Sequence, residues 1–76
     1  MSERPTARRS VYDAIVAAGP TGLTDEEICL TTGLPADTVR PRRLELFMEG
    51  KLDDPPMTRL TTRGRPAQVW VTMQQQ

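Results

Sequence analysis

The sequence predicts a small, mainly α-helical domain that ends in a β-hairpin. Apolar residues in the first half of the chain recur at three- and four-residue spacing, as they do along one face of an α-helix. Gly19-Pro20, Gly33 and Gly50 interrupt this pattern where helices would end. Residues 60–62 suit a strand, and apolar residues alternate with the residues between them over 67–73, on the other side of Gly64, which is typical of a β-hairpin.

Composition excludes several classes of protein. Apolar residues make up 37% of the 76 residues and charged residues 26%, which is an ordinary globular mixture. Histidine is absent and Cys29 is the single cysteine, so a Cys/His zinc site, a Ser-His or Cys-His triad and an internal disulfide are excluded. No apolar run reaches the roughly 18 residues that a membrane span needs. We therefore expect a cytoplasmic protein that is not an enzyme and has no catalytic residues, metal, cofactor or membrane contact.

One domain is the most that this length can hold. We expect it over residues 6–73, preceded by a flexible arm (residues 1–5) and followed by a disordered tail (residues 74–76). A first helix is expected over residues 6–18, and Gly19-Pro20 ends it because proline cannot continue a helix. Residues 21–23 then form a connector or a strand of one bridge. The apolar face of this helix comprises Ala7, Val11, Ala14, Ile15 and Ala18.

A second, short helix is expected over residues 25–32. Thr24 is placed to cap its N-terminus, and Glu27 three residues later completes a capping box. Asp25 and Glu26 fill the first turn, where the helix dipole favours negative charge. The acidic cluster thus has a structural explanation and does not indicate catalysis. Gly33 ends the helix.

A third helix follows from Leu34-Pro35 to about Glu49 and contains Pro41. Proline removes a hydrogen bond inside a helix, so either the regular helix starts late, near residues 37–38, or it kinks at Pro41. Pro41, Leu44 and Met48 then form either an exposed apolar stripe, suited to a homodimer or a protein partner, or a stripe covered by the hairpin or the N-terminal arm.

The remaining residues predict strands. Lys51 and Leu52 open a strand that residues 53–56 break. Residues 60–62 form the first strand of the hairpin, and Arg63-Gly64-Arg65 forms its turn. Alternation over residues 67–73 predicts one return strand, with Trp70 covering the core from the hairpin side.

The order helix, helix–turn–helix and hairpin resembles the winged-helix arrangement over residues 6–73. Residues 24–50 carry the resemblance. An apolar residue anchors each of the two helices, a glycine forms the turn between them, and a small residue lies where the helices cross. Residues 32–46 are similar to the turn and recognition helix of small bacterial and phage winged-helix DNA-binding proteins, and Pro41 resembles the proline of PadR-like regulators. The residues concerned are Ile28, Cys29, Gly33, Leu34 and Val39.

This resemblance implies a winged helix-turn-helix domain, with three helices and a wing, that binds double-stranded DNA. The recognition helix, about residues 36–49, would enter the major groove, and the wing, about residues 59–66, would lie at the backbone or the minor groove. Nine of the ten basic residues are arginines, which bind phosphate and guanine bidentately. Candidate DNA contacts are Thr38, Arg40, Arg42, Arg43, Arg59, Arg63, Gly64 and Arg65, with further backbone contacts from Arg4, Arg8 and Arg9.

Arg40 is the first candidate among these, since it falls on the outer face when Val39 points inward. Arg42 and Arg43 fall nearer the inner face, where they either reach flanking phosphates or pair with the acidic cluster of residues 25–27. Arg63-Gly64-Arg65-Pro66 is identical to the core tetrapeptide of the AT-hook, in which arginines line a narrow A·T minor groove.

A transcriptional regulator, or a phage control or recombination-directing factor, fits this expectation best, and it would be nucleoid-associated when bound to DNA. The alternative is a protein–protein adaptor on the same scaffold. The zero net charge and the sequence pI of about 6.2 favour that alternative, since the whole molecule is not a polycation.

Overall fold

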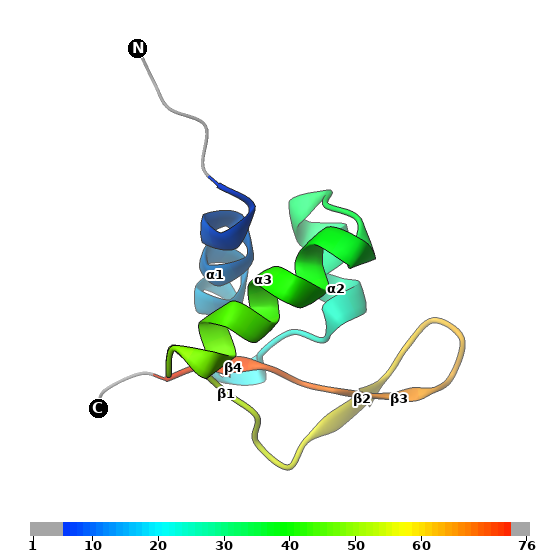
Figure 1. The fold of residues 1–76 in the computed structure, drawn as a ribbon. Helices are drawn as coiled ribbons and strands as arrows, with labels where there is room; N and C mark the ends of the chain where they lie inside the picture. The colour runs from blue at the N-terminus through cyan, green and yellow to red at the C-terminus, as the bar shows by residue number, and fades with distance from the viewer. Residues whose placement is uncertain (1–5, 74–76) are drawn as a thin grey trace.

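The computed structural model describes residues 6–73, which form three α-helices followed by short β-strands (Figure 1). The predicted mainly helical domain with a two-stranded hairpin is confirmed. The predicted arm (residues 1–5) and tail (residues 74–76) lie outside the described residues. The elements are α1 (Ala7–Ala18), the 3-10 helix η1 (Gly19–Thr21), α2 (Asp25–Thr32), α3 (Ala36–Met48), β1 (Leu52–Asp53), β2 (Thr58–Leu60), β3 (Pro66–Gln68) and β4 (Val71–Thr72).

The core lies where the three helices meet β1. Each helix contributes branched aliphatic side chains that are almost fully buried, and burying one such side chain stabilises the fold by roughly 1.5–3 kcal/mol. Partly buried aromatic and aliphatic side chains surround this cluster. The core residues are Val11, Ile15, Ile28, Val39, Leu46 and Leu52.

Local signals fix the ends of the first two helices. The hydroxyl of Thr6 accepts a hydrogen bond from the backbone N–H of Arg9 and caps α1. The predicted capping box of α2 is confirmed: Thr24 Oγ1 accepts from the N–H of Glu27 at 3.3 Å, and Glu27 Oε1 accepts from the N–H of Thr24 at 3.0 Å. Gly33 ends α2 in the left-handed conformation (φ +77°), which glycine adopts without steric cost.

α3 starts at Ala36, as predicted for the recognition helix over about residues 36–49, and not near residues 37–38. Pro35 holds an extended backbone, and its carbonyl accepts from the N–H groups of Thr38 and Val39, so the helix begins at Ala36 and continues through Pro41. Pro41 and Asp37, whose carbonyl loses its helical donor, are both exposed, so water can replace the missing hydrogen bond.

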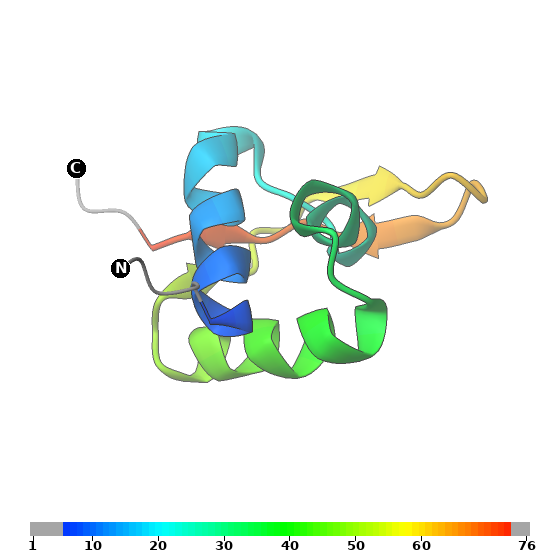
Figure 2. The same ribbon diagram turned by 90° about the horizontal axis from the view of Figure 1, so that it is seen from above.

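The apolar stripe on α3 is exposed. Leu44 is 49% exposed and Met48 76%, and Pro41 is exposed as well. Coverage of this stripe by the hairpin is therefore not observed, and the arm that was the other expected cover lies outside the described residues. The reason is geometric, because the hairpin extends away from the body of the domain rather than folding back over α3 (Figure 2).

The sheet segments also differ from the prediction. β2 pairs antiparallel with β3, and β1 pairs antiparallel with β4. The expected continuous return strand over residues 67–73 is divided, because Trp70 exchanges two backbone hydrogen bonds with Leu23 between β3 and β4. The expected bridge in the connector is thus confirmed. Thr61 and Thr62, expected in the first strand, lie in the turn.

The N-terminal end of α3 and the tip of the β2–β3 hairpin lie on the same side of the molecule in both views (Figure 1, Figure 2). The C-terminal end of α3, β1 and β4 lie on the opposite side. This arrangement places two chain segments that are more than twenty residues apart beside one face of the domain.

Gly19, the first residue of η1, and Gly22, which follows η1, allow the packing at the Leu23–Trp70 bridge to be tested by comparison. Gly19 and Gly22 share a positive φ and an extended ψ, which costs any other residue about 1–3 kcal/mol. A Cβ at Gly22 would lie 2.5 Å from the carbonyl oxygen of Trp70, whereas a Cβ at Gly19 would meet nothing within 4 Å.

We therefore expect Gly22→Ala to destabilise the domain by roughly 1–3 kcal/mol more than Gly19→Ala, because it adds a clash to the same backbone strain. Urea denaturation followed by the fluorescence of Trp70 measures the difference. Equal midpoints for the two variants would show that the bridge tolerates the added methyl group.

Candidate functional site

The first turn of α2 is the point where the other elements attach. Asp25, Glu26 and Glu27 follow one another there, and each carboxylate accepts a hydrogen bond or an ion pair from another part of the chain. The helix dipole stabilises negative charge at this position. We call these three residues the acidic turn.

Arg43 of α3 binds the acidic turn bidentately. Its Nε and Nη2 donate to the two carboxylate oxygens of Asp25 at 2.7 and 2.8 Å. The same guanidinium lies 4.3 Å from the ring centroid of Trp70, and Phe47 meets that ring edge-to-face at 5.4 Å. The expected pairing of Arg43 with the acidic cluster is confirmed, as is the expected position of Trp70 over the core.

Arg59 of β2 binds the other side of the acidic turn. Its Nη2 donates to the carbonyl oxygens of Thr21 and Gly22 at 2.8 and 3.1 Å, and its Nε lies 3.4 Å from Glu27 Oε2. Arg59 therefore joins the hairpin to the connector between α1 and α2.

Glu26 holds the hairpin turn. Its two carboxylate oxygens accept from the backbone N–H and the hydroxyl of Thr62, at 3.1 and 2.8 Å. Within the turn, Thr61 Oγ1 accepts from the backbone N–H groups of Arg63 and Arg65. The Glu26–Thr62 contact was missed by sequence reasoning, because nothing local in either segment indicates a contact across 36 positions.

Most arginines of the described chain are engaged in ion pairs. Arg8 pairs with Glu49, Arg9 with Asp13, and Arg42 with Glu45, in addition to the pairs of Arg43 and Arg59. Among residues 6–73, three arginine side chains remain without an ion pair, and all three are exposed. These are Arg40, Arg63 and Arg65.

The structure thus divides the predicted DNA contacts into two groups. Arg43 and Arg59 carry internal contacts, and Arg42 is held by a half-exposed pair with Glu45 that is worth at most about 1 kcal/mol. Thr38 is half-buried at the start of α3. Arg40 lies in the second turn of α3, and Gly64 separates Arg63 from Arg65 at the hairpin tip, with φ +78°. Arg4 lies outside the described residues.

Cys29 shows no sign of a reactive thiol. Burial raises its pKa, and the nearby charge of Asp25 raises it further, while Arg40 opposes the shift. The thiol is therefore protonated at neutral pH, whereas nucleophilic cysteines have a lowered pKa.

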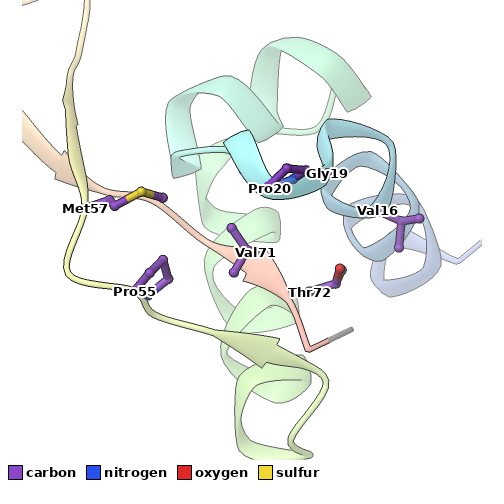
Figure 3. A pocket seen from close by; sticks show the side chains of 7 residues that line it. All are labelled: Val16, Gly19, Pro20, Pro55, Met57, Val71 and Thr72. Atoms are coloured by element: carbon purple, nitrogen blue, oxygen red, sulfur yellow. The ribbon is translucent and has the colours of Figure 1, made fainter. Parts of the chain in front are cut away.

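A pocket of about 550 Å³ lies beside the C-terminal end of α1 and β4 (Figure 3). Aliphatic and proline side chains line it, and none of its lining residues is charged. It therefore lacks the titratable groups that would orient or activate a polar substrate. The lining side chains are those of Val16, Pro20, Pro55, Met57, Val71 and Thr72.

In the part of the chain that the structure describes, no cluster of three or more cysteine, aspartate or glutamate side chains is arranged to hold a metal ion. Over the same residues, no helix has both the length and the apolar character needed to cross a lipid bilayer. Comparison of the chain with models of protein families, with curated proteins and with solved structures finds no match. What the protein binds is therefore inferred from its own residues.

The free energy of unfolding distinguishes an α3 arginine with internal contacts from one with a half-exposed ion pair. We expect Arg43→Ala to lower the free energy of unfolding by about 2–3 kcal/mol, because it removes two charge-assisted hydrogen bonds and the stacking on Trp70. Arg42→Ala is the matched control and should cost less than about 1 kcal/mol, since it removes one half-exposed pair. Urea denaturation measures both, and equal losses would contradict the structural role of Arg43.

Proposed function

We propose that this domain is a winged helix-turn-helix module that binds double-stranded DNA. The observation that carries the proposal is the placement of Arg40, Arg63 and Arg65. They are the exposed arginines without an ion pair among the described residues, and they belong to the two segments, the N-terminal half of α3 and the hairpin tip, that lie on one side of the domain.

The two segments suit the two grooves of a duplex. The major groove of B-DNA admits one α-helix, whose N-terminal residues reach the base edges. Arg40 of α3 would bind a base edge or a phosphate there, with Thr38 on the opposite flank of the helix. The hairpin tip, with Arg63 and Arg65, would contact the adjacent backbone or minor groove. The fixed contacts of Arg43, Arg59 and Thr62 support this arrangement, because a preorganised surface loses little conformational entropy on binding.

A single domain of this size buries about 600–1,000 Å² on DNA, so selective binding would need two copies or repeated sites. A transcriptional regulator, or a phage control or recombination-directing factor, is the role we propose. A protein–protein adaptor is the second candidate, and the exposed stripe of Pro41, Leu44 and Met48 favours it.

Charge-removing variants test the DNA proposal. We expect Arg40→Ala, and the double variant Arg63→Ala/Arg65→Ala, to weaken duplex binding by roughly tenfold or more without lowering stability, because these side chains make no ion pair with any other described residue. Each lost phosphate contact should reduce the slope of log K against log salt by about 1.

Lys51→Ala is the control variant, because it removes the same charge from an exposed side chain beyond the C-terminal end of α3. Fluorescence anisotropy with a labelled duplex, over a series of salt concentrations, measures affinity and slope together. An affinity that neither falls with salt nor changes in the arginine variants would reject DNA binding and leave the adaptor.

A further inference from the structure

The outer face of α3 is apolar where the proposed function requires it to meet base edges. Asp37, Pro41, Leu44 and Met48 are spaced by four, three and four residues, so they lie along one face of the helix. Pro41 and Leu44 occupy the middle of this face and are exposed. Neither side chain carries a hydrogen-bond donor or acceptor.

An apolar side chain can recognise one group in the major groove. The C5-methyl of thymine is the apolar group that a base pair presents there, whereas guanine, cytosine and adenine present donors and acceptors. G·C pairs offer Pro41 and Leu44 no methyl group in this groove, so only A·T pairs give these side chains an apolar contact. Asp37, at the start of the same face, can accept from the amino group of adenine or of cytosine, so it does not discriminate between A·T and G·C pairs.

The hairpin tip gives a separate reason to expect A·T-rich DNA. Thr61 Oγ1 accepts hydrogen bonds from the backbone N–H groups of Arg63 and Arg65. The backbone N–H of Gly64 donates to the carbonyl of Thr61, and the backbone N–H of Thr61 donates to the carbonyl of Arg65. The turn is therefore closed on itself, and the two guanidinium groups are the donors that it offers outward. Gly64 places no side chain between them.

Paired arginines of this kind suit a narrow minor groove. A-tracts have the narrowest minor groove and the strongest negative potential, which favours inserted arginine side chains. The N2 amino group of guanine projects into this groove and is absent from A·T pairs.

We propose that the DNA bound by this domain is A·T-rich, and that the two segments read it by different means. Pro41 and Leu44 contact thymine methyl groups in the major groove, and Arg63 and Arg65 enter the narrowed minor groove beside it. This inference rests on the proposed DNA-binding function, and it names the class of sequence bound.

Four duplexes that differ only in their central base pairs separate the two readings. The first has an A·T centre, and the second has the same centre with uracil in place of thymine, which removes the methyl groups alone. The third has a G·C centre. The fourth has inosine in place of guanine, which removes the N2 amino group from the minor groove and leaves the major-groove edge unchanged.

With the unmodified protein, the A·T duplex should bind best, and uracil should weaken binding by about fourfold for each contacted methyl group. Inosine should restore part of the affinity that the G·C centre loses. Competition against the labelled A·T duplex measures all four affinities at one salt concentration.

Two variants assign these effects to their segments. Leu44→Ser should reduce the difference between thymine and uracil to the part that Pro41 contributes, and it should leave the difference between inosine and guanine unchanged. Arg63→Lys/Arg65→Lys keeps the charge. It should abolish the difference between inosine and guanine and leave the difference between thymine and uracil unchanged, because the strongly hydrated ammonium group is less suited to a narrow groove. Each variant is thereby the control for the other, and thermal unfolding confirms that both remain folded.

Equal binding of the A·T and G·C duplexes, with a steep salt dependence, would overturn this inference and leave the proposed function standing. Insensitivity to uracil would remove the role of Pro41 and Leu44, and insensitivity to inosine would remove that of the arginine pair. Absence of binding to all four duplexes would reject both proposals and favour a protein partner for the exposed face of α3.

Discussion

The acidic turn at the start of α2 is the interaction on which the rest of the structure depends. Its three consecutive carboxylates bind α3, the hairpin turn and β2, through Arg43, Thr62 and Arg59 respectively. Glu27 also completes the capping box, so the same group stabilises the helix end and accepts an ion pair. The contacts of Asp25 and Glu26 are charge-assisted hydrogen bonds, which are about twice as strong as neutral ones, and Glu27 adds an ion pair with Arg59. α3, β2 and the hairpin turn are thereby held against one helical turn.

This arrangement fixes the position of α3 relative to the hairpin tip. α3 and the hairpin tip are both tied to the acidic turn, so the position of Arg40 relative to Arg63 and Arg65 follows from the position of α2. It also determines which arginines are available to a ligand. The acidic turn neutralises Arg43 and Arg59, and other carboxylates neutralise Arg8, Arg9 and Arg42. Among residues 6–73 the arginines without an ion pair therefore lie on α3 and at the hairpin tip, although the net charge of the protein is zero.

α3 departs from the usual amphipathic pattern, and the departure has a physical cause on each face. Arg43 lies on the inner side, because Asp25 and the ring of Trp70 together replace the water that its guanidinium would lose. Leu44 and Met48 lie on the outer side, where no described segment covers them. The inner face is therefore more polar, and the outer face less polar, than those of an ordinary surface helix. A helix with an apolar outer face is suited to meet a partner molecule.

The sequence by itself determined what depends on neighbouring residues. The caps at Thr24 and Gly33 and the ends of α1 and α2 follow from short-range hydrogen bonding, and the apolar spacing correctly predicted Val11, Ile28 and Val39 as core residues. Tertiary structure decided what depends on residues far apart. The Leu23–Trp70 bridge divided the return strand, although its two residues are 47 positions apart.

The candidate site divides in the same way. The sequence identified the basic segments and offered two roles for Arg43, but it could not choose between them, because each guanidinium can bind either a phosphate or a carboxylate. Only the folded chain decided, by placing Asp25 within 2.7 Å of Arg43 and no carboxylate within ion-pair distance of Arg40, Arg63 or Arg65 among the described residues. Ion-pair partners are set by packing in three dimensions, and the local sequence does not encode them.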